Sequence, residues 1–322
     1  MIEIEHLIKR FGPIAAVDGV SFRVAKGEVL GFLGPNGAGK STTMKMITGY
    51  LKPTSGRVRV MGEDALAHPI AAQRAIGYLP EGAPAYGDMT PRQFLHFCAD
   101  ARNVPPAGRA ASIERSVEMT ELEGVLDQPI ETLSKGFKRR VGLAQAILSD
   151  PPCLVMDEPT DGLDPNQKHS VRQLIAKMAK DKAIILSTHI LEEVDAVCTR
   201  ALIINRGRIV ADGTPGELMA RSRYYNAVTV VIGVEKAETA RQIFRLQTSI
   251  LGHEERAQEK GRIAFTLLPR PGRSIIEGLL ITLRERNIEA HEYVIEQGRL
   301  DEVFRTLTAE TETEIVARGD AA

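Results

Sequence analysis

The chain lacks an excess of charge of either sign. Its 322 residues include 41 lysines and arginines and 42 aspartates and glutamates, so the formal net charge is −1. A protein that binds nucleic acid usually carries a basic excess, and neither the first 220 residues nor the remainder shows one. We therefore expect no nucleic-acid partner.

Cysteine is scarce and long apolar runs are missing. The three cysteines, Cys98, Cys153 and Cys198, form no C-x-x-C pair and fit a reducing compartment, where each would be a small buried hydrophobic residue. The longest apolar runs, such as residues 227–234, are far below the roughly 18 residues that a membrane-spanning helix needs. The N-terminus is acidic and alternating, so we expect no signal peptide. These absences predict a soluble protein that would act at a membrane only through a partner.

One stretch carries the strongest functional signal in the chain. Residues 34–42 read Gly-Pro-Asn-Gly-Ala-Gly-Lys-Ser-Thr and match G-x-x-x-x-G-K-[ST], the phosphate-binding loop of nucleoside triphosphatases. The apolar run 29–33 predicts a buried parallel strand before the loop, and residues 43–47 predict a helix after it. The alternative, a glycine-rich turn with a chance lysine, does not account for this strand–loop–helix context.

The residues of this loop define its chemistry. Glycines let the backbone wrap a phosphate with its N–H groups pointing inward, and the helix N-terminus adds a partial positive charge. Lys40 can reach the β- and γ-phosphates, and the Ser41 hydroxyl can ligate Mg²⁺. The predicted nucleotide-binding residues of the loop are Gly34, Pro35, Asn36, Gly37, Ala38, Gly39, Lys40, Ser41 and Thr42.

The first two thirds of the chain predict an α/β fold. Alternating residues near the N-terminus and at 56–61 favour antiparallel strands, and helical periodicity runs from about residue 90 to residue 148. The apolar runs 153–156 and 183–186 predict buried strands on either side of a helix at 168–178. Such a strand–helix–strand order implies a parallel sheet.

The last third predicts a smaller, separate unit. Strand-like and helical stretches alternate in it at 228–234, 237–246, 262–268, 274–286, 291–295 and 300–307. We expect a nucleotide-binding domain at 1–222 with a helical subdomain at about 85–150, and an accessory α+β domain at 223–309. The polar tail, 310–322, is expected to be flexible. The accessory domain shows no motif with known chemistry.

Two further groups of polar residues follow predicted strands. Asp157 and Glu158 come after an apolar run, where the first carboxylate can hold Mg²⁺ through water and the second can orient or deprotonate an attacking water. His189 follows the strand at 183–186 and can hydrogen-bond a γ-phosphate. Each group alone is also compatible with a structural role, as acids at a strand end or a lone histidine.

A second anion site is predicted at the start of another helix. Residues 133–140 read Leu-Ser-Lys-Gly-Phe-Lys-Arg-Arg and open an apolar-periodic helix. Ser134 and Gly136 offer a hydroxyl, backbone N–H groups and the helix dipole to a phosphate. The plainer alternative is that Ser134 only caps the helix.

In this order the motifs resemble those of the ATP-binding cassette (ABC) ATPases, over about residues 1–220. Residues 34–42 resemble Walker A, residues 153–158 Walker B, and residues 134–137 the Ser-Gly-Gly-Gln signature. The remaining correspondences are Asp164 in the D-loop, His189 as the switch histidine, Glu81 in the lid loop, and Phe11 where an aromatic ring stacks on adenine. The resemblance implies a P-loop NTPase fold of ABC type, with an antiparallel β subdomain and a helical subdomain, here joined to a small C-terminal α+β domain.

The sequence departs from the family pattern at two places. Lys135 and Phe137 replace a glycine and the glutamine of the signature, while Ser134 and Gly136 remain. Glu81 replaces the lid-loop glutamine, and its carboxylate can still approach Mg²⁺. Both variations resemble the exporter-type subfamily that includes gliding-motility and multidrug ATPases, which also tends to carry a small C-terminal domain.

The resemblance implies a mechanism and a setting. Two copies would bind head to tail, with ATP between Lys40 of one and Ser134 of the other, so that a homodimer is needed for hydrolysis. Glu158 would be the base, while Ser41, Asp157 and Glu81 would serve Mg²⁺. An integral membrane permease would be the partner, and the chain would be cytoplasmic and peripheral on the inner face of the cell membrane.

Two alternatives belong to other classes. A soluble ABC ATPase of translation or DNA repair usually carries two cassettes, long coiled coils or zinc motifs, and this chain shows one cassette and none of those insertions. A pure interaction module with an inactive site is disfavoured because Lys40 and Glu158 are intact. We therefore predict an ATP-hydrolysing subunit that drives an exporter.

Overall fold

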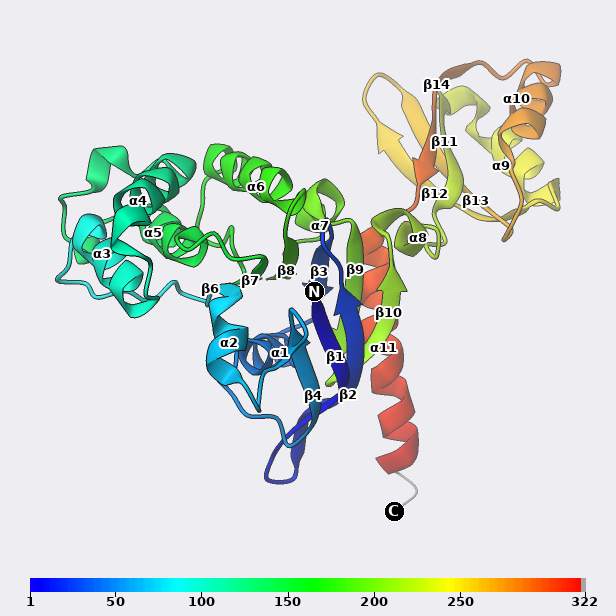
Figure 1. The fold of residues 1–322 in the computed structure, drawn as a ribbon. Helices are drawn as coiled ribbons and strands as arrows, with labels where there is room; N and C mark the ends of the chain where they lie inside the picture. Colours follow the sequence, from blue (N-terminus) through cyan, green and yellow to red (C-terminus); the bar gives the residue numbers. More distant parts are fainter. Residues whose placement is uncertain (320–322) are drawn as a thin grey trace. The chain divides into compact units, whose positions relative to one another are not determined.

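The computed structural model describes the backbone of residues 1–319 and the side chains of residues 1–309. The chain divides into two compact units, residues 1–214 and residues 215–322 (Figure 1). The predicted domain boundary at 222/223 lies inside the second unit, just ahead of its first strand. Of the predicted flexible tail, residues 320–322 lie outside the described residues.

A six-stranded sheet forms the centre of the first unit, in the order β10-β9-β3-β8-β7-β6. The strands β6, β7, β8, β3 and β9 are parallel, and β10 runs antiparallel to β9. The bounds are β3 Val29–Leu33, β6 Ile76–Leu79, β7 Cys153–Asp157, β8 Ala183–Thr188, β9 Arg200–Asn205 and β10 Arg208–Gly213. Every residue of β3, β7 and β8 is buried, as expected for central strands of a parallel sheet.

Helices connect these strands or lie beside them. Their bounds are α1 Lys40–Ile47, α2 Pro69–Arg74, α6 Pro165–Ala179 and α7 Leu191–Val197. The strand–helix–strand arrangement of β7, α6 and β8 confirms the parallel α/β prediction. Since β3, β8 and β7 are consecutive parallel strands, their carboxyl ends meet at one edge of the sheet.

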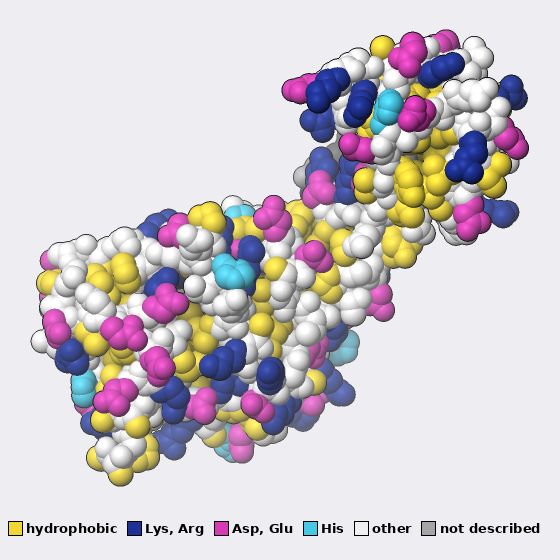
Figure 2. Space-filling view, turned by 90° about the horizontal axis from the view of Figure 1, so that it is seen from above, with side chains coloured by type: hydrophobic (Ala, Val, Ile, Leu, Met, Phe, Trp, Pro, Cys, Tyr) yellow, Lys and Arg dark blue, Asp and Glu magenta, His cyan; other side chains and the backbone are white. Residues whose placement is uncertain are grey.

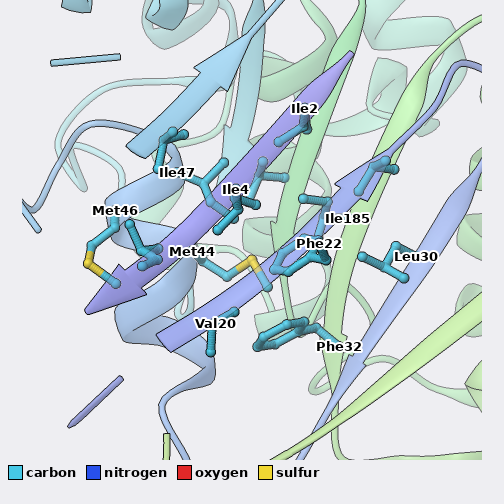
Figure 3. Packing of buried hydrophobic residues seen from close by; sticks show 14 of the residues in the cluster. Ile2, Ile4, Val20, Phe22, Leu30, Phe32, Met44, Met46, Ile47 and Ile185 are labelled. Carbon is cyan, nitrogen blue, oxygen red and sulfur yellow. The ribbon is translucent and has the colours of Figure 1, made fainter. Parts of the chain in front are cut away.

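A second sheet of four antiparallel strands packs near α1, in the order β2-β1-β4-β5. Its strands are β1 Ile2–Phe11, β2 Ile14–Val24, β4 Ser55–Val60 and β5 Glu63–Asp64. Figure 3 shows Ile4 and Phe22 of this sheet meeting Phe32 of the central sheet and Met44 of α1. This shared apolar core fixes α1, and the loop before it, between the two sheets.

The helical part of the first unit has a core of its own. Its helices are α3 Pro91–Ala101, α4 Pro106–Thr120 and α5 Lys135–Ile147, with short 3₁₀ turns at Glu123–Val125 and Ile130–Thr132. The start of α3 is fixed by a capping box between Thr90 and Gln93, followed by proline at the first helical position. Buried side chains from all three helices, such as Leu95, Val117 and Val141, form one cluster.

The second unit is a four-stranded antiparallel sheet, in the order β12-β13-β11-β14, with two helices on one face. Its elements are α8 Pro215–Met219, β11 Tyr225–Gly233, a 3₁₀ turn Val234–Lys236, α9 Ala237–Leu246, β12 Ile250–Gln258, β13 Arg262–Pro269, α10 Ile276–Glu285, β14 Ala290–Gln297 and α11 Leu300–Gly319. Sequence patterns missed β12 because it is an edge strand whose last five residues are all exposed and polar or small. The remaining sheet strands and both covering helices lie where the patterns placed them.

The three cysteines are buried and free, as predicted. Burial raises the pKa of the Cys98 and Cys153 thiols to about 11 and that of Cys198 to about 12. On the surface, Figure 2 shows basic and acidic side chains interspersed on the face in view. Among the described residues, none of the helices combines the length and the apolar character that crossing a bilayer requires.

Truncating Phe265 should destabilise the second unit. This side chain is 0% exposed and its ring lies 5.2 Å from that of Phe244 in an edge-to-face arrangement. Phe265→Ala should cost about 3–5 kcal/mol of unfolding free energy, because it removes buried area and leaves a cavity. Hydrogen exchange of β11 and β13 in the full chain would measure the loss. Tyr293→Ala, at a position 55% exposed in the same sheet, is the matched control; equal exchange in both variants would contradict the prediction.

Candidate active site

The phosphate loop connects β3 with α1 at the carboxyl edge of the central sheet. Gly34 has no space for a side chain, because an added Cβ would lie 2.4 Å from the carbonyl oxygen of Ile204. Gly39 has a left-handed φ of 108°, and an added Cβ would lie 2.5 Å from the carbonyl oxygen of Ala16. These glycines let the loop pass close to its neighbours before α1 begins. Residues 40–42 then form the first turn of that helix.

Lys40 is buried, with 7% of its surface exposed. Its Nζ donates to the carbonyl oxygens of the first two loop residues, at 2.6 and 3.1 Å. Burial lowers the pKa of this amine, while the nearby carboxylates of Glu158, Asp157 and Glu81 oppose that shift. The structure therefore brings the loop lysine close to the predicted acidic residues.

Asp157 ends β7 and is 1% exposed. One carboxylate oxygen, Oδ1, accepts a hydrogen bond from the Ser187 hydroxyl at the end of β8. The other, Oδ2, is buried and has no hydrogen-bond partner among the described residues. A buried carboxylate oxygen without a donor is costly, so it indicates a place for a water molecule or a cation.

Glu158 and His189 face each other across the ends of β7 and β8. Glu158 Oε1 lies 2.9 Å from His189 Nδ1, and the backbone of Glu158 is left-handed with φ of 51°. The Glu158 side chain is 19% exposed and that of His189 is 55% exposed. Both polar groups are therefore within reach of a ligand at this edge.

Glu81 follows β6 and Pro80, and it is exposed. Because β6 pairs with β7, this lid loop begins beside the strand that carries Asp157. Its carboxylate is close enough to oppose, in part, the lowering of the Lys40 pKa by burial. Five predicted residues, from three strand ends and one helix, thus share one edge of the sheet.

The signature and D-loop residues form a second group. Ser134 caps α5 by accepting a hydrogen bond from the backbone N–H of Phe137, at 3.3 Å. An added Cβ on Gly136 would lie 2.6 Å from Oε1 of Gln167, near the start of α6. Asp164 caps α6 and accepts from the Gln167 N–H at 2.9 Å. These residues therefore lie at the adjoining N-termini of α5 and α6.

Phe11 is the last residue of β1, a strand that carries none of the residues of the two groups described above. Its side chain is 49% exposed, and the Lys9 ammonium lies 5.1 Å from its ring centre. The ring is therefore partly accessible, and aromatic rings of this kind can stack on other rings.

Sequence reasoning missed three residues that make hydrogen bonds at or near the acidic strand end. Ser187 bonds Asp157, Glu193 accepts hydrogen bonds from the Thr160 and Thr188 hydroxyls, and Arg139 donates to backbone carbonyls around Glu158. The sequence did offer an indication for Ser187, because it lies two residues before His189. Arg139 had none because its partners are backbone atoms, and Glu193 had none because Thr160, one of its two partners, lies 33 residues away.

The residues at this edge fit a magnesium ion only if a nucleotide completes its ligands. Among the described residues, no cluster of three or more histidine, cysteine, aspartate or glutamate side chains is arranged to hold a metal. The hydroxyl of Ser41 and the unpartnered Oδ2 of Asp157 are hard oxygen ligands of the kind Mg²⁺ prefers. Phosphate oxygens would supply the rest, as is usual for this ion.

The fold and these residues define a P-loop nucleoside triphosphatase. A glycine-rich loop joins a buried parallel strand to a helix, and its lysine lies beside a carboxylate pair at the neighbouring strand ends.

Comparison with known proteins assigns the family. The ABC transporter family matches residues 17–161. A Nod factor export ATP-binding protein I of Ralstonia nicotianae is 33% identical over 315 residues, covering 96% of this chain and 94% of the relative. The probable multidrug ABC transporter ATP-binding protein YbhF of Escherichia coli is 37% identical over 223 residues, covering 69% of this chain and 38% of the relative. A solved ATP-binding subunit of an ABC transporter is 31% identical with a TM-score of 0.64, covering 68% of this chain and 91% of that one.

The chain belongs to the ATP-binding subunits of ABC transporters, and it is an ATPase. The predicted fold class and family resemblance are confirmed, and a role in transport is favoured over one in translation or DNA repair. Subunits of this family work as dimers with membrane permeases.

Proposed function

We propose that this chain forms a homodimer around ATP and powers a separate integral membrane permease that exports its substrate. The observation that carries the proposal is the gathering of Lys40, Asp157, Glu158 and His189 at one sheet edge, where Asp157 Oδ2 has no hydrogen-bond partner within the described part of the chain. The export direction is supported by the names of relatives that match nearly the whole chain.

Each residue has a proposed role in phosphoryl transfer. Lys40 and the loop N–H groups bind the β- and γ-phosphates. On binding, the Lys40 ammonium exchanges its hydrogen bonds to loop carbonyls for hydrogen bonds to phosphate oxygens. Glu158 accepts a proton from the attacking water and His189 bonds the γ-phosphate. Phe11 stacks on adenine, with its ring already exposed.

Magnesium is the proposed cofactor. Ser41 would ligate it directly, Asp157 would hold it through water, and Glu81 would approach it from the lid loop. When bound, the ion neutralises charge on the phosphate oxygens. Ser187 keeps the Asp157 carboxylate oriented by donating to its other oxygen.

The two separate groups of polar residues support a head-to-tail dimer. Ser134 and Gly136 lie at the start of α5 beside α6, while Lys40 starts α1 between the two sheets. In the proposed dimer, ATP bound at Lys40 of one protomer meets Ser134, Gly136 and Asp164 of its partner. Lys135 lies 3.6 Å from Asp161, so its charge is partly balanced within the chain.

The proposed permease site is a groove in the first unit. It has a volume of about 1190 Å³ and lies between the α1–α2–β6 region and the helical part. Ile70 and Tyr50 line one side, Asn103 and Arg115 line the other, and Glu81 lies at the lid loop. A permease segment in this groove would contact both parts of the unit and the lid loop, so that closure around ATP could be transmitted to the membrane. The chain would thereby be peripheral on the cytoplasmic face.

Ile70→Asp should separate ATP hydrolysis from permease binding. Ile70 is 62% exposed and lies outside the phosphate site, so its change should leave basal turnover intact while placing a charge in the groove. The full chain would be purified from detergent-solubilised membranes, and the co-purifying integral membrane protein identified and quantified.

The control for this experiment is Leu246→Asp, at a position 82% exposed in the second unit. We expect it to retain the membrane protein, while Ile70→Asp loses most of it. Equal retention by both variants would refute the groove assignment, and the absence of any membrane protein from the wild-type purification would refute the permease role.

A further inference from the structure

Arg139 is buried although it carries a charge. It lies in the second turn of α5 and is 5% exposed. Arginine is almost never buried to this extent unless its charge and its donors are satisfied. Its helix belongs to the helical part of the first unit, whereas its partners are loops at the catalytic edge of the central sheet.

The guanidinium donates to four backbone carbonyl oxygens. Nη2 donates to the carbonyls of Asp157 and Glu158, and Nε donates to that of Pro159 at 3.4 Å. Nη1 donates to the carbonyl of Pro80 at 3.0 Å. One side chain therefore joins the end of β7 to the lid loop that follows β6.

Two of these carbonyls belong to the peptide groups on either side of the Glu158 Cα. That residue has a left-handed backbone, with φ of 51°, which a non-glycine side chain adopts at a cost. Such a conformation persists only when the surrounding structure holds it. Arg139 donates to the carbonyl oxygens of both flanking peptide groups, in addition to the hydrogen bonds that Ser187 and the Asp161 N–H make with Glu158.

The charge of Arg139 suits this place. Burial lowers the pKa of its guanidinium, while Asp161, Asp157, Glu158 and Glu81 oppose the shift. Arginine nevertheless remains charged in proteins, and its planar fork carries five donors. A lysine has a point charge and cannot reproduce the fork.

We propose that Arg139 is a positioning residue for ATP hydrolysis: it sets the backbone of Glu158 and of the lid loop, and so ties the orientation of the base to α5. The proposal rests on the proposed role of Glu158. Arg139 acts through that residue and does not itself touch the nucleotide.

The test compares Arg139→Met and Arg139→Lys with Arg140→Met in the full chain. Arg140 is a matched control, because it is 9% exposed on the same helix but pairs with Glu121 at 2.7 Å, within the helical part. We expect Arg139→Met to lower kcat about 10²-fold with KM for ATP nearly unchanged, because a misplaced catalytic group costs about this much. The kcat of Arg139→Lys should lie between those of Arg139→Met and the wild type. The kcat of Arg140→Met should stay within about threefold of the wild-type value.

A double variant separates positioning from general damage. In a Glu158→Gln background, adding Arg139→Met should lower the residual turnover by less than about twofold, because both changes remove the same contribution. A further 10²-fold loss in that background would overturn the proposal, as would equal kcat values for Arg139→Met and Arg140→Met. Near-normal turnover of Glu158→Gln alone would overturn the base assignment and this proposal together, whereas the first two results would overturn this proposal alone.

Discussion

Glu158→Gln should bind ATP and barely hydrolyse it. The substitution keeps the size of the side chain and removes the carboxylate that would accept the proton of the attacking water. A positioned general base contributes about 10²–10⁴-fold, so kcat should fall by that factor. Glu158 has the necessary access, since its side chain is 19% exposed and lies 2.9 Å from His189.

The measurement is phosphate release from ATP by the full chain, with ATP affinity determined separately. The Kd for ATP should stay near the wild-type value, because Lys40 and the loop N–H groups are untouched. Glu192→Gln, at an exposed position in α7, is the control and should turn over normally. Hydrolysis by Glu158→Gln at close to the wild-type rate would remove Glu158 as the base.

Lys40→Ala should weaken ATP binding, and hydrolysis should fall as a result. Lys40 Nζ is buried and donates hydrogen bonds to the carbonyl oxygens of Gly34 and Pro35, which it can exchange for phosphate oxygens. Hydrogen bonds to charged groups are worth about 1.5–3 kcal/mol each, and the loss of at least one should weaken ATP binding by about 10–10²-fold.

Calorimetric or fluorescence titration with ATP would measure this affinity. Lys52→Ala changes a lysine at an exposed position outside the phosphate loop and should bind ATP normally. The two variants at the site differ in kind: Lys40→Ala should fail at binding, and Glu158→Gln should fail after it. An unchanged Kd in Lys40→Ala would place the phosphates elsewhere.

Elements with one dominant local signal could be predicted from sequence. Residues 29–33 were predicted as a strand and form β3, because an uninterrupted apolar run between glycines has few other solutions. Residues 237–246 were predicted as a helix and form α9. The edge strand β12 was missed because its place depends on pairing with β13, and its own residues show little apolar alternation.

The candidate site divides in the same way. The loop lysine and the acidic pair could be predicted from the sequence, because phosphate and metal binding require those side chains at a fixed spacing. The left-handed backbone of Glu158 and the four carbonyl contacts of Arg139 could not be predicted from the sequence. Every residue has a backbone carbonyl, so no residue type or spacing indicates such contacts. Contacts of a side chain with distant backbone become visible only in three dimensions.

The three buried cysteines have a practical consequence for following motion in this protein. Thiol-directed dyes react with the thiolate, and the raised pKa values of Cys98, Cys153 and Cys198 keep that form rare at neutral pH. The native thiols should therefore react slowly in the folded chain. A single cysteine introduced on the surface would carry a fluorophore against a quiet background, without replacing any native residue.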